Sequence, residues 1–343
     1  MMFRSLSRIA PQLITLGAIV LLVTAFFPDF ILIGYERERL VGPIIDVLKR
    51  GAPVALLAIG MTLVIATRGI DLSVGTVMAI SGAIGAWAIS SGLGLAPTLA
   101  LAIGAGLLCG LWNGCLVAVI GIQPIVATLI LMTSGRGIAQ LITEGRILTF
   151  SDPSFAFFGS GTLFGMPFPA VLWVLLALVV TLLMRRTALG ILVEAIGVNR
   201  SASALAGVNA RVLLIAVYMA AGLCAAFAGI VATADIRGAD ANNTGLWLEL
   251  DAILAVVIGG NSLLGGRFSI AASVIGAMII QTIDTGILLA GFPSEYNLVI
   301  KAGLVLIILV VQSPNLAQSW RFVKDESRRR RERSYEARKE LRS

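Results

Sequence analysis

Long apolar runs recur along almost the whole chain, and short polar segments separate them. Runs of about 20 residues have the length that an α-helix needs to cross the hydrocarbon core of a bilayer, about 30 Å. The pattern therefore predicts an all-α, polytopic membrane protein with about ten transmembrane helices. The predicted spans are Pro11–Ile33, Gly51–Thr67, Leu72–Ser91, Pro97–Ile120, Gln123–Ile142, Phe168–Met184, Val212–Ala234, Leu250–Gly260, Ile270–Ala290 and Leu298–Gln312.

Two of these runs differ from the rest. Leu250–Gly260 is short and ends in glycine, so we expect a tilted or broken span there. The first run follows Arg4 and Arg8, as the hydrophobic region of a signal peptide does. The segment after it, Phe26-Phe27-Pro28-Asp29, does not supply the small residues that a cleavage site needs. We therefore expect the first run to remain as a membrane anchor.

Composition supports the membrane class and separates the C-terminal end from the rest. The chain is 58% hydrophobic and only 13% charged, whereas soluble domains carry roughly 25% charged residues. We divide it into a transmembrane domain, residues 1–312, and a basic cytoplasmic tail, residues 313–343. The tail is expected to bind the anionic bilayer surface, at about 1 kcal/mol for each basic residue near the surface. It lacks regularly spaced aromatic residues for stacking on bases, so we expect no nucleic-acid partner.

Lysine and arginine placement predicts the orientation. If both termini lie inside, the inner segments hold eight basic residues besides the tail, and the outer segments hold six. The positive-inside rule then places both termini and the loop at residues 185–211 in the cytoplasm. The inner set is Arg4, Arg8, Arg68, Arg185, Arg186, Arg200, Arg211 and Arg267, and the outer set is Arg37, Arg39, Lys49, Arg50, Arg146 and Arg237.

The chain lacks the residue patterns of an enzyme or a metal protein. Histidine is absent, and the three cysteines, Cys109, Cys115 and Cys224, lie in apolar runs without C-x-x-C spacing. This placement indicates buried thiols and neither a disulfide framework nor a metal site. No G-x-x-x-x-G-K-[ST] phosphate loop and no nucleophile constellation occurs. We therefore expect no catalysis, no cofactor and no ATP binding in this chain.

The loop at residues 185–211 is the most informative polar segment. Asn199 can cap a short helix, and Gly207 can end it by adopting a left-handed conformation. The residues between them are mostly small, so we expect a two-turn helix with a flat face. Such a face performs no chemistry, but it can dock closely in a groove on another protein.

In this loop, Glu194-Ala195-Ile196-Gly197 precedes the small-residue helix. A Glu-Ala-x-Gly segment followed by such a helix resembles the coupling loop of ABC-importer permeases. The string Gly69-Ile70-Asp71-Leu72-Ser73-Val74-Gly75 resembles the permeases of ribose-type sugar importers, which usually carry glycine where this chain has Arg68. Gln123–Leu129 and Gly259–Arg267 fit the same family. The resemblance implies a type II ABC-importer permease fold that couples to a cytoplasmic ABC ATPase. The implied coupling residues are Glu194, Gly197, Asn199, Arg200, Ala202, Ala204 and Gly207.

Within this family, Ile236–Leu254 resembles the galactofuranose permeases more than the ribose permeases. The resemblance implies import of galactofuranose or a related monosaccharide across the bacterial inner membrane. It further implies three partners: a periplasmic sugar-binding protein, a second, non-identical permease and a fused two-domain ATPase. The implied periplasmic docking candidates are Arg237, Asp240, Asn242 and Asn243.

Polar side chains inside apolar runs are candidates for the translocation pathway, because an ionised group at the bilayer centre costs at least about 2.5 kcal/mol. The deepest acid is Asp284, where the family usually has asparagine; it either faces the pathway or is protonated or hydrogen-bonded to a neighbouring helix. Asp71 is expected to cap the helix that restarts after a glycine turn. The candidates are Asp71, Asn113, Gln140, Gln281 and Asp284.

Two ladders of small residues predict close helix contacts, within one subunit or between two. One consists of Ala102, Gly106, Gly110 and Gly114, and the other of Ala221, Ala225 and Gly229.

Two other functions remain open at this stage. A self-sufficient carrier or channel would need ion-coupling residues or a charged filter, and it would not need the docking loop. A permease of the same architecture for ribose, another pentose or hexose, branched-chain amino acids or cobalamin would differ only in its cargo. Uptake measured with and without an ATPase distinguishes a self-sufficient carrier from an ATP-driven permease. The affinity of the binding protein for different solutes distinguishes the possible cargoes.

Overall fold

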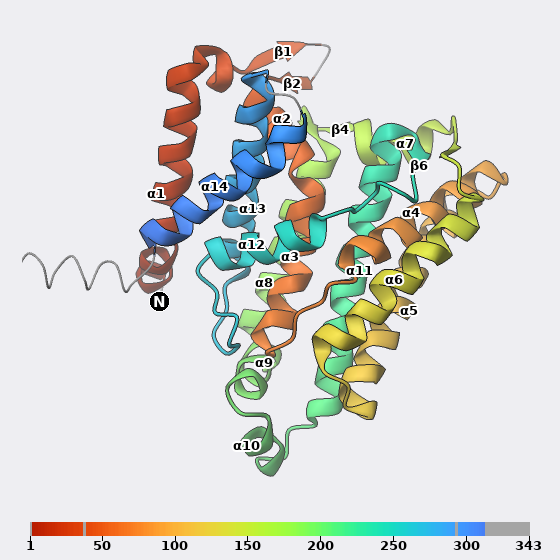
Figure 1. Ribbon diagram of the computed structural model, residues 1–343, viewed down its shortest axis with the longest axis vertical. Helices are drawn as coiled ribbons and strands as arrows, with labels where there is room; N and C mark the ends of the chain where they lie inside the picture. The colour runs from red at the N-terminus through yellow and green to blue at the C-terminus, as the bar shows by residue number, and fades with distance from the viewer. Residues whose placement is uncertain (1, 37–38, 292–293, 313–343) are drawn as a thin grey trace, which may run out of the picture. The chain divides into compact units, whose positions relative to one another are not determined.

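The computed structural model describes residues 2–36, 39–291 and 294–312, and most of them are helical (Figure 1). Its contacts form two units, Met1–Ala290 and Gly291–Ser343, and each is described by itself. The helices are α1 (Met2–Phe26), α2 (Pro43–Arg50), α3 (Ala52–Ala66), α4 (Val74–Ser90), α5 (Leu95–Cys115), α6 (Pro124–Thr143), α7 (Pro153–Ser160), α8 (Phe168–Arg186), α9 (Leu189–Val198), α10 (Arg200–Leu205), α11 (Ala210–Ile236), α12 (Leu248–Ile258), α13 (Ile270–Leu289) and, in the second unit, α14 (Ser294–Gln312).

Every predicted span overlaps one of these helices, and the all-α membrane class is confirmed. Six helices in the described part of the chain are long and apolar enough to cross a bilayer. The pair α2 and α3, which bends by 44°, gives a seventh if it is counted as one span. Helices α4 and α12 have only 17 and 11 residues, which is short for a membrane crossing. The number of ten crossings therefore remains a prediction.

The first helix departs from its predicted bounds at both ends. It begins at Met2 and ends at Phe26, whereas the predicted span began at Pro11 and continued to Ile33. Pro28 begins a short 3-10 helix, Pro28–Ile31, because its ring fixes the backbone and its nitrogen has no hydrogen to donate to the preceding turn. The amide of Gln12 on α1 donates a 3.0 Å hydrogen bond to the Gly259 carbonyl, which ties α1 to the end of α12.

Helix α11 packs against α3, α4 and α5 at the centre of the first unit. A β-carbon added at Gly106 would lie 2.5 Å from the Gly222 carbonyl oxygen, and one added at Gly110 would lie 2.4 Å from that of Tyr218. About two turns farther along α11 from Gly222, a β-carbon at Gly229 would lie 2.2 Å from the Met78 carbonyl oxygen. Both ladders therefore join helices within one subunit.

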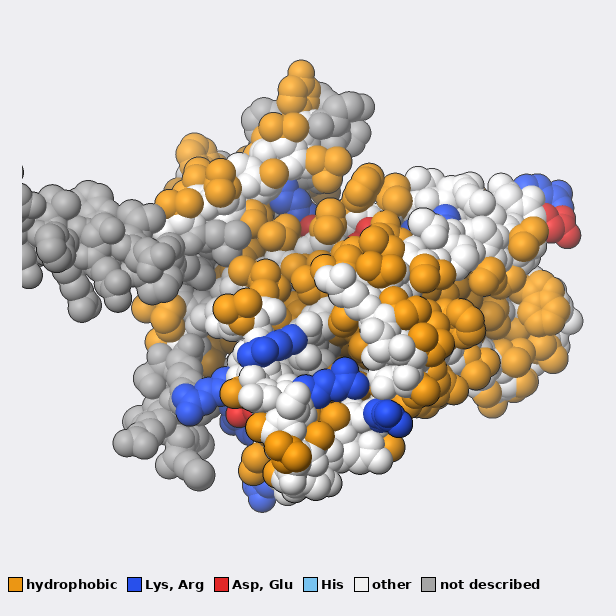
Figure 2. Space-filling model, turned by 60° about the horizontal axis from the view of Figure 1, so that its bottom comes forward, with side chains coloured by type: hydrophobic (Ala, Val, Ile, Leu, Met, Phe, Trp, Pro, Cys, Tyr) orange, Lys and Arg blue, Asp and Glu red, His pale blue; other side chains and the backbone are white. Residues whose placement is uncertain are grey.

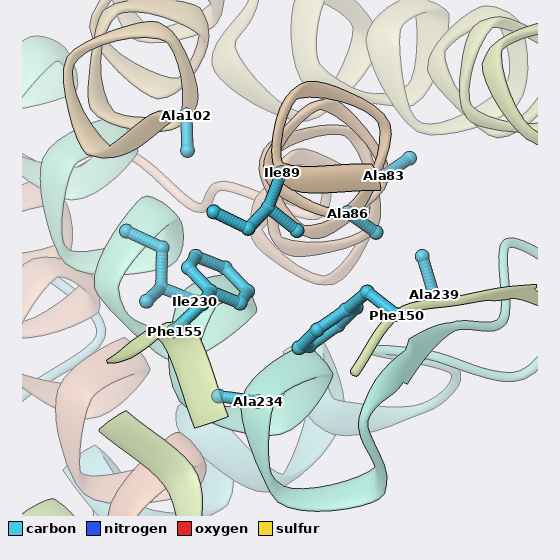
Figure 3. Packing of buried hydrophobic residues seen from close by; sticks show 9 residues of the cluster. All are labelled: Ala83, Ala86, Ile89, Ala102, Phe150, Phe155, Ile230, Ala234 and Ala239. Atoms are coloured by element: carbon cyan, nitrogen blue, oxygen red, sulfur yellow. The ribbon is translucent and has the colours of Figure 1, made fainter. Parts of the chain in front are cut away.

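A small apolar cluster closes one end of this helix group (Figure 3). Phe150 and Phe155 meet edge to face, with ring centroids 5.1 Å apart, beside alanines of α4 and α11. Asp152 caps α7 by accepting hydrogen bonds from the Ser154 and Phe155 amides. The Ser154 hydroxyl donates to the same carboxylate, and these bonds hold the pKa of Asp152 below its usual range.

Strands are few and short, and all pair antiparallel. The three two-stranded ribbons are β1 (Gly34–Glu36) with β2 (Arg39–Val41), β3 (Leu148–Thr149) with β6 (Gly238–Ala239), and β4 (Thr162–Leu163) with β5 (Met166–Pro167). Near the C-terminal end of α11, just before β6, Asp235 forms an ion pair with Lys49, with 2.7 Å between Oδ1 and Nζ. These contacts fix the start of the segment between α11 and α12.

Candidate functional site

The loop predicted to dock the ATPase forms two short helices, α9 and α10, at the lower end of the molecule in Figure 1. The Asn199 side chain accepts a hydrogen bond of 3.0 Å from the Ala202 amide, so the predicted cap is confirmed. Gly207 has φ +86°, which confirms the predicted left-handed end. Helix α10 has six residues, slightly fewer than the two turns that we expected.

Most of the predicted coupling residues lie on the exposed surface of α10 and its two ends. Asn199, Arg200, Ala202, Ala204 and Gly207 are exposed, and Glu194 is half-buried. An open hollow of about 490 Å³ lies against this surface. Figure 2 brings this end toward the viewer and shows Lys and Arg side chains spread over it. The hollow is lined by Arg200, Ser201, Ala204, Val208, Asn209, Ala210 and Arg211.

Gly197 differs from the other predicted coupling residues because it is buried. A β-carbon at this position would lie 1.9 Å from the Ala66 carbonyl oxygen and 2.6 Å from the Gly266 nitrogen. The Gly266 amide itself donates a 2.9 Å hydrogen bond to the Ala66 carbonyl. Gly197 therefore lets α9 pack against the end of α3 and does not form part of the exposed surface.

Arg68 strengthens this contact, although the sequence indicated only an orientation charge for it. Its Nη2 atom donates a 2.7 Å hydrogen bond to the Val198 carbonyl at the end of α9. Its Nε atom donates a 2.8 Å hydrogen bond to the Leu264 carbonyl in the loop between α12 and α13. Arg68 has φ +65°, a conformation that glycine adopts more easily. The arginine thus connects the end of α3, the docking helices and a distant loop.

The break between α3 and α4 contains a buried polar cluster. Asp71 Oδ1 accepts hydrogen bonds from the Ser73 amide at 2.9 Å and the Ser73 hydroxyl at 2.6 Å. Asn113 Nδ2 donates a 2.8 Å hydrogen bond to the same hydroxyl. Asp71 and Asn113 are 2% and 1% exposed, so in this conformation the cluster lies inside the subunit. This burial favours a structural role for these two pathway candidates.

The predicted helix cap at this break is wrong by two residues. Helix α4 begins at Val74, and its N-cap position is Ser73. Asp71 instead stabilises the turn before the helix, because its carboxylate accepts from Ser73 two residues later.

The segment between α11 and α12, residues 238–247, runs along α4 toward its N-terminal end. Ala239 belongs to the apolar cluster that includes Ala86 of α4 (Figure 3), and Ala241 packs in a second cluster with Ala79. Farther along, a β-carbon at Gly245 would lie 2.1 Å from the Gly75 carbonyl oxygen. Positions 86 and 75 are about 16 Å apart along a helix at 1.5 Å per residue. The segment therefore enters the helix bundle as non-helical backbone.

Helix α6, a candidate membrane span, holds this entering segment. Arg136 Nη1 donates hydrogen bonds to the carbonyls of Ala241 at 2.9 Å and Thr244 at 2.7 Å. Arg136 lies seven residues before the end of α6 at Thr143, which is about 10 Å along the helix axis. Unpaired backbone carbonyls among packed helices would be costly, and the guanidinium group supplies donors for two of them.

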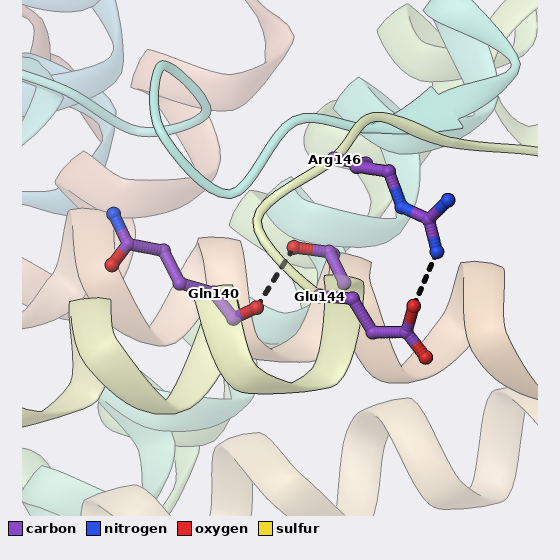
Figure 4. Close-up of polar contacts among 4 residues, drawn as sticks. Gln140, Glu144 and Arg146 are labelled. Atoms are coloured by element: carbon purple, nitrogen blue, oxygen red, sulfur yellow. Dashed lines mark hydrogen bonds and ion pairs between the residues drawn. The ribbon is translucent and has the colours of Figure 1, made fainter.

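The polar side chains of the segment are fixed by one another and by α6. Asp240 Oδ1 accepts from the Asn242 and Asn243 amides at 3.0 and 3.1 Å, and Oδ2 accepts from Asn243 Nδ2 at 2.8 Å. Gln140 Nε2 donates a 2.8 Å hydrogen bond to Asn242 Oδ1. Figure 4 shows the Gln140 amide extending away from the ion pair between Glu144 and Arg146 at the end of the helix.

The remaining pathway candidates lie on another helix. Gln281 is buried on α13, with its Nε2 atom 3.5 Å from Thr285 Oγ1, and Asp284 is half-buried on the same helix. Helix α13 packs against α1, α3 and α12. The five candidates therefore occupy three separate places: the α3–α4 break, the α6 surface at Gln140, and α13. In the described ranges, no group of three or more Cys, Asp and Glu side chains is placed to hold a metal ion.

Comparison with known proteins gives one family match and several similar relatives. The family described as "Branched-chain amino acid transport system / permease component" matches residues 44–309. The galactofuranose transporter permease protein of Escherichia coli (strain K12) is 58% identical over 303 residues, which cover 88% of this chain and 89% of that protein. No solved structure gives a significant match.

The names of two further relatives refer to other sugars. The fructose import permease protein of Bifidobacterium longum (strain NCC 2705) is 40% identical over 316 residues, which cover 90% of this chain and 89% of that protein. The ribose import permease protein of Escherichia coli (strain K12) is 34% identical over 306 residues, covering 88% and 92%.

Proposed function

Because this chain belongs to the family of branched-chain amino acid transport system permease components, we propose that it is the membrane subunit of an ATP-driven, binding-protein-dependent sugar importer. The predicted family, and the predicted role as a transport permease and not an enzyme, are confirmed by the family match and by the three permease relatives. The observation that carries the sugar assignment is the 58% identity to the galactofuranose permease over nearly the whole chain.

The docking surface on α10 supports a separate cytoplasmic ABC ATPase as the source of energy. Its exposed side chains are mainly small, and Ala204 lines an open hollow of about 490 Å³ in which a partner side chain can pack. Arg68 connects the neighbouring α9 to the end of α3. A displacement of α10 by the ATPase would therefore reach the α3–α4 break through direct contacts.

The remaining partners follow from the same assignment. A periplasmic sugar-binding protein delivers the cargo, and Arg237 is exposed at the end of α11 where such a protein could dock. A second, homologous but non-identical permease completes the pathway, and the ATPase is a fused two-domain protein. The complex lies in the bacterial inner membrane with both termini in the cytoplasm. The basic tail, residues 313–343, lies outside the described residues.

The proposed cargo is galactofuranose or a closely related monosaccharide. Fructose and ribose appear in the names of relatives that are 40% and 34% identical, so these sugars are the next candidates. An ATP-independent secondary carrier is a weaker candidate, because it gives no role to the exposed surface of α10.

The affinity of the cognate binding protein tests the cargo. We expect the purified binding protein to prefer galactofuranose over galactopyranose, fructose and ribose by at least about tenfold in Kd, because a site that hydrogen-bonds hydroxyl groups discriminates strongly between their arrangements. Isothermal titration with each sugar measures this ratio. Tight binding of a branched-chain amino acid or a corrinoid, with none of a sugar, would refute the sugar assignment.

A further inference from the structure

The segment at residues 238–247 exposes polar side chains within the helix bundle. Contact between these side chains and lipid hydrocarbon would cost free energy. Asn242 and Asn243 are exposed, yet they lie between Ala241, which packs in the helix bundle, and Gly245, which contacts the first turn of α4. Non-helical backbone at membrane depth occurs where it is buried in protein or lines an aqueous cavity. The exposed side of this segment therefore faces water or a partner subunit, and not the hydrocarbon.

Trp247, at the end of the same segment, is held in an unusual conformation. Its backbone has φ +65°, which a bulky side chain rarely adopts, and it occupies the N-cap position of α12 without making a side-chain cap. The residue is 52% exposed. A glycine at this position would relieve the strain. Strained positions cluster at functional sites, where the surrounding structure maintains them.

An open hollow lies along α6 and the turn after it, and its lining includes no residue of 238–247. It has a volume of about 620 Å³ and includes Ser134, Gly137 and Gln140 among its lining residues. Gln140, one of its lining residues, donates a hydrogen bond to Asn242 Oδ1 of the segment.

We propose that Asn242, Asn243 and Trp247 form a contact site for a neutral, hydroxyl-rich cargo inside the translocation pathway, an inference that rests on the proposed function. The asparagine amides donate and accept hydrogen bonds, as sugar hydroxyls do. The flat apolar face of the indole packs against the C–H face of a sugar ring. Asp240, Gln140 and Arg136 do not contact the cargo; they hold the segment in place.

Variants at Trp247 separate this role from a structural one. In proteoliposomes that contain both permeases, the ATPase and the binding protein, we expect Trp247→Gly to lower uptake of labelled galactose at least tenfold. The same variant should melt at an unchanged or higher temperature, because glycine tolerates the positive φ. Trp247→Phe, which keeps an aromatic face, should retain at least a third of the uptake. ATPase stimulation by loaded binding protein should change less than twofold in both variants.

Trp112 provides the matched control, because this tryptophan on α5 is 54% exposed and lies outside the segment. Trp112→Ala should leave uptake within twofold of the unsubstituted complex. If the unsubstituted complex imports galactose and Trp247→Gly imports it at the same rate, the contact site is refuted while the proposed function stands. If the unsubstituted complex imports no sugar, both are refuted.

Cysteine labelling tests whether the second permease covers this surface instead. A single cysteine introduced by Asn243→Cys, in a chain without its three native cysteines, should react with a small water-soluble thiol reagent in the assembled complex. The rate should fall at least threefold when binding protein and galactose are present. Labelling in the isolated permease, with none in the assembled complex, would identify the surface as a subunit interface and overturn the proposal.

Discussion

Gly106→Leu should prevent the permease from forming a stable, monodisperse protein in detergent. A β-carbon at Gly106 would lie 2.5 Å from the Gly222 carbonyl oxygen and 2.6 Å from the Ala226 side chain. The first neighbour is backbone of the central helix α11, which cannot move without disturbing its contacts with α3 and α4. Overpacking typically costs 1–3 kcal/mol, and we expect about 3 kcal/mol or more here because the clash is with backbone. Size-exclusion chromatography after a heating series measures this loss.

Gly104→Leu is the matched control on the same helix. Gly104 also lies within α5, and a β-carbon there would have no neighbour within 4 Å. Both variants add the same side chain to the same helix, so differences in propensity or membrane insertion cancel. We expect the control to keep the melting temperature within a few degrees, since a substitution without new contacts changes stability by about 0.5 kcal/mol or less. Equal damage by both substitutions would contradict the close packing of α5 on α11.

Ala204→Trp should abolish co-purification of the ATPase while the permease still folds. Ala204 is exposed on α10 and lines the hollow into which the partner is proposed to pack. The indole would fill this hollow and hold the two surfaces apart. Hot-spot contacts at interfaces contribute about 2 kcal/mol or more each, so losing one weakens association at least about 30-fold. Affinity purification through a tag on the permease measures the amount of ATPase retained.

Ala100→Trp controls for the insertion of a tryptophan. Ala100 is also an exposed alanine, but it lies on α5, away from the docking surface. We expect this variant to retain the ATPase at the level of the unsubstituted chain. Retention of the ATPase by the Ala204→Trp variant, at the control level, would show that α10 is not the docking site.

The features that the sequence predicted correctly depend on residues close together in the chain. Asn199 caps a helix by bonding an amide three residues later, and Gly207 ends it through its own backbone. The helices that coincide with the predicted spans follow from continuous apolar runs. The small-residue ladders predicted close contacts, but only the structure showed that Gly106 meets Gly222 in the same subunit.

The features that were missed depend on contacts between distant residues. Arg68 binds carbonyls that lie 130 and 196 positions later in the chain. Arg136 holds the segment at residues 238–247 by bonding carbonyls 105 and 108 positions away. A single sequence does not reveal such pairs, since any exposed arginine could supply the same charge. The short eighth apolar run predicted a tilted or broken span at Leu250–Gly260, but it did not indicate that the segment before it enters the bundle.

The pathway candidates illustrate the same limit. A polar residue in an apolar run is unusual because its burial in a bilayer costs free energy. Its role depends on its hydrogen-bond partners. Asp71 and Asn113 lie 42 positions apart and share Ser73 inside the subunit. Gln140 instead holds the exposed Asn242. The sequence predicted that these side chains need partners, and the fold determines which of them face water.

Uptake by reconstituted proteoliposomes tests the central claim most directly, because it asks whether this permease moves sugar only when the ATPase and the binding protein act on it. Labelled galactose is supplied with the binding protein outside, and ATP is enclosed with the ATPase side of the complex. We predict accumulation that requires ATP, the ATPase subunit and the binding protein together, and that disappears when any one of them is omitted. Accumulation by the permease alone, at the rate of the full complex, would contradict the account.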